Sequence, residues 1–470
     1  MDNVTHALAG ALLAAATIAL VERRTPRAAL PDAPLPNALL PEAPLPDAPN
    51  TRKPSPWTRF RTTAFVVGLV TAELPDADLL YAGPALGMGN LGYLLHHRGH
   101  THTIVFALLA ALLAWGVTLL VRRELRSAPW RWPLLALATA GTLSHLLLDF
   151  TNSYGVHPFW PVDNRWFYGD AIFIIEPWLW VIALPPLLLI ALRGWTRGIL
   201  GFLLAGILAA TWMVDMVSRD VAIVITLATV LWYFATRGIS PHRRALSGIG
   251  AWVVVELIFF VSSAAARSEV HAATSDSTRR DVVLTPLVGN PFCFSAIVVE
   301  LDGEIYRSTA AVVAAFPAIR DARGCEGQAA TPVAPSVMDS SASPPFTPVV
   351  GRAARVVNGR IGTRSVTWRE GWEAPHAELL TIVSSRCEAR AAMHFIRVPQ
   401  WYGAYADSIV LFDRRYGAQG VTRVTTPSAG GRCPTSVPGW IPPRRDILGD
   451  AVRGDEVQGN AIEADAPLRP

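Results

Sequence analysis

Charged residues are scarce in this sequence. They make up 17% of its 470 residues, while 51% are hydrophobic, and soluble proteins usually carry about 25% charged residues. This balance excludes a disordered chain, a coiled coil and a typical water-soluble enzyme. The net charge of +4 is small for the length and gives no indication of a nucleic-acid partner. The composition therefore favours a membrane protein, provided that the hydrophobic residues are clustered.

The sequence also lacks the motifs of several enzyme classes. It has neither the GxSxG turn of serine hydrolases nor the GxxxxGK[ST] loop that cradles phosphates. No CxxC pair occurs, which argues against a zinc–thiolate site. The four cysteines all lie in the C-terminal part: Cys293, Cys325, Cys387 and Cys433. One or two disulfides are expected if that part lies outside the cytoplasm, and their pairing stays open.

The hydrophobic residues are clustered in the first 267 positions. Roughly 20 apolar residues cross a bilayer as a helix, and most of the clusters reach that length. The clusters at 62–81 and 221–236 are only marginally suited to cross the membrane. For 62–81, a re-entrant or interfacial segment is the alternative. The eight stretches are 4–21, 62–81, 102–121, 133–151, 171–192, 199–217, 221–236 and 247–266.

Basic residues alternate between the connecting loops. Sixteen Arg and Lys residues follow the first, third, fifth and seventh stretches, and three lie in the other loops. Positive charge near helix ends tends to stay in the cytoplasm. The pattern predicts eight membrane crossings, with both termini outside the cytoplasm and membrane lipids as partners. No cleavable signal peptide is expected, because the basic residues follow the first stretch.

The remaining segments are proline-rich, strand-like or polar. Residues 25–58 hold ten prolines and predict a cytoplasmic loop inside a helical domain at 1–267. Residues 268–445 predict a smaller, water-exposed β-rich domain, and 446–470 a disordered tail. Within the β-rich domain, 321–346 is expected to be a long loop. The clearest strand patterns are at 294–301, 365–372 and 406–416.

Ionisable residues gather at four places near the ends of the predicted membrane helices. Such groups are costly inside a membrane, so each needs a reason. Under the predicted topology, all four places share one depth on the outer side. They are His6 at the start of the first helix, Glu73, Asp76 and Asp78 at the end of the second, the run His96, His97, Arg98, His100 and His102 just before the third, and His145 and Asp149 at the end of the fourth.

Imidazoles and carboxylates together suit a divalent metal, with zinc first and manganese or iron as alternatives. His145 and Asp149 are four residues apart and share one helical face. For each residue alone, an ordinary interfacial or turn role is the alternative reading. The full set of candidate ligands is His6, Asp76, Asp78, His97, His100, His102, His145 and Asp149. If six of these are genuine, two ions are possible.

Three residues at the same places are candidates for catalysis. A carboxylate that is not a ligand, Asp78 or Glu73, could act as general base. Arg98 could hold an anionic group, because its guanidinium donates two parallel hydrogen bonds. These roles suit hydrolysis by water that a metal has activated.

Several of these segments resemble the YdjM/YbcI-type inner-membrane proteins. The shared motifs are Thr5-His6, LPDAD at 74–78, HRGHTHT at 97–103, SHLLLDFTNSYG at 144–155 and PFWP at 158–161. The resemblance covers about residues 1–180, and IRVPQWYGAY at 396–405 with VLFDRRYG at 410–417 looks like the family's C-terminal pattern. The resemblance implies a membrane-bound, metal-dependent hydrolase of the bacterial inner membrane, without defining a substrate.

The sequence thus favours a hydrolase at the outer membrane face, acting on an amphiphilic or anionic substrate such as a lipid-linked or phosphate-bearing molecule. A transporter or proton relay is one alternative. Against it, the ionisable groups cluster at one surface rather than at the midplane, and no inverted repeat is apparent. An envelope protein with a structural metal is the other alternative.

Overall fold

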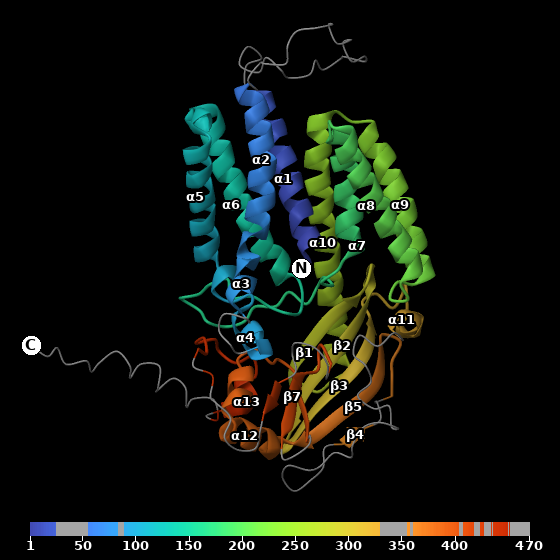
Figure 1. The fold of residues 1–470 in the computed structure, drawn as a ribbon. Helices are drawn as coiled ribbons and strands as arrows, with labels where there is room; N and C mark the ends of the chain where they lie inside the picture. The colour runs from blue at the N-terminus through green and yellow to red at the C-terminus, as the bar shows by residue number, and fades with distance from the viewer. Residues whose placement is uncertain are drawn as a thin grey trace, which may run out of the picture.

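The protein consists of a helical bundle that stands on a β-rich part, as Figure 1 shows for the computed structural model. The two parts meet at one end of the bundle, and the ends of the helices that carry most of the arginines lie at the other. The residues that the structure describes are 1–24, 55–82, 89–329, 355–357, 361–403, 408–417, 424–426, 434, 436–449 and 451. Most of the predicted proline-rich loop and of the predicted tail therefore lies outside the described residues.

Six helices of the described chain are long and apolar enough to cross a membrane: α1 (Asn3–Arg24), α5 (Ile104–Val121), α6 (Ala128–Phe150), α8 (Gly194–Met213), α9 (Arg219–Arg237) and α10 (Pro241–Ala272). Two more helices stand beside them in the bundle, α2 (Pro56–Glu73) and the 14-residue α7 (Pro177–Ile190). This confirms the predicted architecture of a multi-pass helical region followed by a smaller β-rich one. By length and apolar composition, six helices of the described residues could span a membrane, whereas the sequence predicted eight.

Short helices connect the long ones and carry most of the polar motifs. Between α2 and α5 the chain forms η2 (Leu74–Asp78), α3 (Leu79–Ala82), α4 (Gly89–His96) and η3 (His100–His102). The short η4 (Arg123–Arg126) joins α5 to α6. Pro75 sits in the first turn of η2, where a missing N–H costs nothing. The predicted stretch at 62–81 is therefore a helix that ends at Glu73 and then changes direction.

Helices α1 and α2 pack with their backbones almost in contact. A Cβ atom on Gly10 would lie 2.3 Å from the carbonyl oxygen of Gly68. At Gly141 of α6, a Cβ would lie 2.1 Å from Oγ1 of Thr71 on α2. Small residues permit such close helix packing in membranes. This packing holds the start of α1, the end of α2 and the end of α6 together at the end of the bundle that faces the β-rich part.

The β-rich part contains two antiparallel sheets. The larger has the strand order β1-β2-β3-β5-β4, built from β1 (Arg279–Leu287), β2 (Asn290–Asp302), β3 (Ile305–Ala314), β5 (Val366–Pro375) and β4 (Arg355–Val357). The smaller has the order β6-β7-β8, from Pro399–Gly403, Ile409–Asp413 and Val424–Thr426. Short helices α12 (His376–Ser385), α13 (Cys387–Ala392) and α14 (Arg445–Leu448) accompany them. Each of the three predicted strand patterns overlaps a strand, namely β2, β5 and β7.

The expected long loop at 321–346 begins with a helix instead. Helix α11 (Ala322–Ala329) is fixed by a disulfide from Cys325 to Cys293 of β2. The side chain of Gln328 in this helix also donates to the carbonyl oxygen of Val288. These contacts with distant residues order a segment whose composition is typical of a loop. Cys387 is disulfide-bonded as well, and Cys433 lies outside the described residues.

A buried ion network joins the helical and β-rich parts. The guanidinium of Arg397 contacts both oxygens of Asp170, at 2.8 and 2.9 Å, and Oδ2 of Asp281 on β1 at 2.7 Å. Arg267 of α10 reaches the same Asp170 at 2.8 Å. Burial would raise the pKa of Asp281, but the charges of Arg397 and Arg444 hold that pKa well below its usual range. The network therefore consists of ionised groups that compensate each other.

Replacing Arg397 should weaken the attachment of the β-rich part. Arg397→Met leaves Asp170 and Asp281 buried without their main partner, and losing one member of a buried pair costs about 3–5 kcal/mol. We expect a clear drop in the melting temperature of the full chain in detergent. Arg165→Met is the matched control, because Arg165 pairs with Asp163 at the surface. Equal melting temperatures for the two variants would contradict a joining role for Arg397.

Candidate metal centre

The four polar places predicted from the sequence meet at the end of the bundle that faces the β-rich part. His6 comes from the first turn of α1, Asp76 and Asp78 from η2, and His102 from η3. His145 and Asp149 lie on one face of α6, in its last two turns. Local capping fixes two of these segments: Asp2 accepts from the N–H of Thr5 in α1, and Thr103 accepts from that of Phe106 in α5.

Four side chains form a compact group of metal-ligand type, namely Asp76, His102, His145 and Asp149. Their ligand atoms all lie within 4.8 Å of one another. Nε2 of His102 is 3.0 Å from Oδ2 of Asp149 and 3.4 Å from Oδ1 of Asp76. Nε2 of His145 lies 3.5 and 3.4 Å from the same two oxygens. Three of the four side chains are buried and Asp76 is partly so, so the group is closed to bulk water on most sides.

Both histidines turn the same ring nitrogen toward the centre of this group. Nδ1 of His145 lies 2.6 Å from the carbonyl oxygen of Ala72, which can only accept, so this nitrogen carries the proton. Nδ1 of His102 faces Oδ2 of Asp78 at 3.3 Å. Metal-ligating histidines commonly donate their second nitrogen to a carbonyl or carboxylate in this way. The Nε2 atoms are thereby oriented for one common ligand.

Two carboxylate oxygens of this group lack hydrogen-bond partners among the described residues and could bind a cation. In the described part of the chain, Oδ1 of Asp76 and Oδ2 of Asp149 are buried and lack a partner with hydrogen-bond geometry. Buried polar atoms are normally paired, and an unpaired one calls for an explanation such as an ion. Two carboxylates and two imidazoles form a donor set that suits divalent ions. The residues present therefore fit a metal.

Protonation would compete with a metal for His102. Burial lowers the pKa of this histidine, but its contacts with Asp149, Asp76 and Asp78 outweigh burial and raise the pKa to about 10. These contacts therefore favour the protonated form of the ring when no metal is bound. Histidine must be neutral to bind a metal, so binding at His102 would release a proton.

A second group of ligand type comprises Asp76, Asp78 and His97, and it shares Asp76 with the first. Asp78 also organises the turn before η3. It accepts from Nδ1 of His97 at 3.0 Å, from the N–H of Arg98 at 3.0 Å and from the hydroxyl of Thr101 at 2.8 Å. Burial raises the pKa of Asp78, but the contacts with His102 and His97 outweigh it and keep that pKa below its usual range.

Arg98 points inward and pairs with Asp149 of the first group. Its backbone lies in the left-handed region, with φ of 59°. Nη2 donates to Oδ1 of Asp149 at 2.9 Å, and Nη1 donates to Oδ1 of Asn152 at 3.0 Å. The guanidinium is buried over the ring of Tyr154. The structure thus gives Arg98 a partner inside the protein, and binding of a substrate anion by this residue stays a prediction.

The other candidates from the sequence lie around these two groups. His6 stacks on the ring of His145 at 3.7 Å, and its Nε2 is 3.4 Å from Oδ1 of Asp149. Glu73, at the end of α2, is half-buried, and its Oε1 has no hydrogen-bond partner among the described residues. His100 belongs to neither group: its ring lies 4.8 Å from that of Trp160 and 4.7 Å from that of Trp440.

Residues of the β-rich part cover the polar turn beside the centre, and the sequence gives no local signal for them. Nε1 of Trp440 donates to the carbonyl oxygen of Leu95 at 2.9 Å. The ring of Trp440 also stacks on His157 at 3.8 Å. On the same side, Nε1 of Trp166 donates to the carbonyl oxygen of His394 at 2.7 Å. The polar turn at 97–103 is therefore held between the bundle and the β-rich part.

Comparison with known proteins agrees with the motifs. The sequence profile of the YdjM inner membrane protein family matches residues 1–222, which include every candidate ligand. The inner membrane protein YbcI of Escherichia coli (strain K12) is 34% identical over 154 residues, which are 28% of this chain and 82% of that protein. No solved structure matches the chain. The chain therefore belongs to the YdjM inner membrane protein family.

Proposed function

We propose that this protein is a membrane-bound, metal-dependent hydrolase of the inner membrane. The observation that carries the proposal is the convergence, within 4.8 Å, of the ligand atoms of two histidines and two aspartates, including two carboxylate oxygens that lack a partner with hydrogen-bond geometry in the described chain. Asp76, His102, His145 and Asp149 would hold the metal. When bound there, a divalent ion would act as a Lewis acid and lower the pKa of water to about 7.

Zinc is the proposed ion, and manganese or iron is the alternative. Two imidazoles with carboxylates are typical of catalytic zinc, which keeps one position open. Asp76 is the most exposed member of the group and so marks the side from which water would enter. Since Asp76 also belongs to the group with Asp78 and His97, it could bridge to a second ion there.

Three surrounding residues would act as general base, as a positioning residue and as a balancing charge. Glu73 is the proposed general base, because its Oε1 is unpaired and could accept a proton from water. Asp78 would position the turn, since both of its oxygens already have partners. Arg98 would balance the charge of Asp149 and so keep the buried carboxylate ionised.

The substrate is proposed to be amphiphilic or anionic, such as a lipid-linked or phosphate-bearing molecule. The centre lies where the ends of membrane helices meet the β-rich part, so an apolar portion could stay in the bilayer while the scissile bond reaches Asp76. We place this end of the bundle outside the cytoplasm, because the arginine-rich helix ends lie at the opposite one.

Metal content should depend on His102 and His145 but not on His100. His102→Ala and His145→Ala each remove one of the ligand atoms, so elemental analysis of the purified protein should show loss of the bound ion. His100→Ala is the matched control within the same motif, because its ring lies against two tryptophans instead. Unchanged metal content in the His102→Ala, His145→Ala double variant would refute the proposed centre.

Glu73→Gln should separate metal binding from catalysis. We expect full metal content and a kcat lowered about 10²–10⁴-fold, which is the usual contribution of a general base. The measurement is release of phosphate or alcohol from phosphomonoesters and from lipid esters presented in vesicles. A protein with full metal content that hydrolyses none of these substrates would favour the alternative of a structural metal.

A C-terminal fusion should report the side of the membrane. Alkaline phosphatase fused after residue 470 should be active in cells, because it folds only outside the cytoplasm. The same enzyme inserted within residues 25–54 should be inactive, since the arginine-rich loops face the cytoplasm. The reverse pattern of activities would invert the proposed topology while leaving the metal centre untouched.

A further inference from the structure

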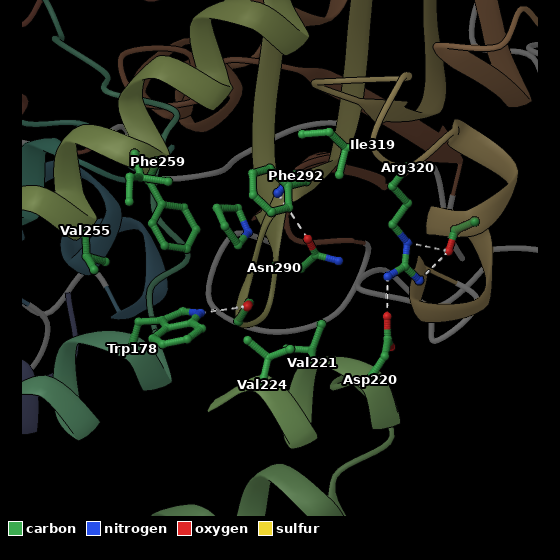
Figure 2. A pocket seen from close by; sticks show the side chains of 14 residues that line it. Trp178, Asp220, Val221, Val224, Val255, Phe259, Asn290, Phe292, Ile319 and Arg320 are labelled. Carbon is green, nitrogen blue, oxygen red and sulfur yellow. Dashed lines mark hydrogen bonds and ion pairs between the residues drawn. The ribbon is translucent and has the colours of Figure 1, made fainter. Parts of the chain in front are cut away.

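A cavity lies away from the metal centre, between the bundle and the β-rich part (Figure 2). Its volume is about 610 Å³, and its walls are mostly apolar. Trp178 of α7, Val221 and Val224 of α9, and Val255 and Phe259 of α10 form the bundle side. The turn between β1 and β2, with Phe292 and Ile319, forms the other side. A volume of this size holds a small molecule or one chain of a lipid.

Hydrogen bonds fix the wall of this cavity where the two parts meet. Nε1 of Trp178 donates to the carbonyl oxygen of Gly289 at 2.8 Å, as Figure 2 shows. The N–H of Gly289 donates to the buried carboxyl of Glu176 at 3.3 Å. The side chain of Asn290 donates to that of Gln328 at 3.0 Å. The cavity is therefore pre-formed rather than an incidental gap between loose segments.

The cavity opens onto the surface of the bundle that faces the lipid. Val224 and Ile258, which line it, are 54% and 42% exposed. The exposed apolar surface continues along the same two helices through Leu227, Val254 and Leu257. Arg219 and Asp220 begin α9 beside the opening, and charged residues at a helix end mark the edge of the hydrocarbon layer. The opening therefore lies where acyl chains are available.

We propose that this cavity binds one acyl chain of a membrane phospholipid, at the boundary between the bundle and the β-rich part. Water is a poor occupant, because a buried water needs two to four polar partners and these walls are mostly apolar. A lipid tail gains no transfer free energy by leaving the bilayer, so it would be retained by van der Waals packing against the walls.

The rim of the cavity predicts how selective the site is for headgroups. Arg320 forms an ion pair with Asp220, and its Nε donates to the carbonyl oxygen of Gly324 at 3.0 Å (Figure 2). The cationic side chain at the rim is thus already neutralised. Charge therefore gives little reason to prefer an anionic headgroup, and the acyl chain supplies the recognition.

Native mass spectrometry of the full-length protein after delipidation in detergent tests this site. The wild type should keep one phospholipid per chain, with phosphatidylethanolamine and phosphatidylglycerol retained equally when supplied equally. The double variant Val224→Trp, Ile258→Trp fills the opening and should reduce bound lipid roughly tenfold, because the tail loses its packing contacts. The matched control Leu231→Trp, Val254→Trp changes exposed residues of the same two helices that do not line the cavity.

A second measurement needs no cavity-filling variant. In vesicles whose lipids carry bromine on the acyl chain, quenching of tryptophan fluorescence should be smaller in Trp178→Phe than in the wild type, because the indole of Trp178 lines the cavity. A delipidated wild type without bound lipid, equal lipid in both double variants, or unchanged quenching in Trp178→Phe would overturn the proposal. Metal content should not change in any of these variants, so the outcome is independent of the metal centre.

Discussion

The buried carboxylate of Asp149 determines the layout of the polar end of the bundle. An ionised carboxylate that is removed from water must be compensated by nearby charges and hydrogen bonds, or the fold loses several kcal/mol. Its partners are Arg98, His102, His145, His6 and the amino group of Met1. They come from α1, from the turns before α5 and from α6 itself. The polar cluster can form only when these segments meet, and their backbones meet closely because Gly10, Gly68 and Gly141 leave room.

Sequence reasoning located this cluster because its signals are local. The spacing of His145 and Asp149 places both on one helical face, and the alternation of arginines places all the motifs at one depth. It could not tell which of these residues would form a group of ligand type. His100 and His102 are two residues apart, yet only His102 enters a group of ligand type. That difference depends on the turn at Arg98, whose φ of 59° follows from contacts with Asp78 and Asn152 far away in the sequence.

In the β-rich part, local patterns predict the strands but not the contacts that this part makes with the bundle. Alternation predicted strands at 294–301, 365–372 and 406–416, and all three are present. No local sequence pattern indicates that Trp440 donates a hydrogen bond to the carbonyl oxygen of Leu95. Nor does one indicate that Arg397 pairs with Asp170, which is more than two hundred residues away in the sequence. Likewise, α11 forms in a segment of loop-like composition because Cys325 is tied to Cys293. Such contacts are set by tertiary packing, which overrides local propensity.

The candidate ligands and the β-rich residues packed beside them come from different regions of the chain. Every candidate ligand lies within residues 1–222, the region that matches the family profile, whereas His394, Arg397 and Trp440, which hold the cover in place, lie beyond it. The ligand groups and their cover are thus carried by different parts of the chain. Asp76 is the least buried member of the candidate group, and Trp440 packs against His100 and Leu95, beside the turn that carries His102. Under the proposed function, the metal ligands would come from the membrane helices and their connecting turns, and the β-rich part beside them would influence which substrates reach the centre.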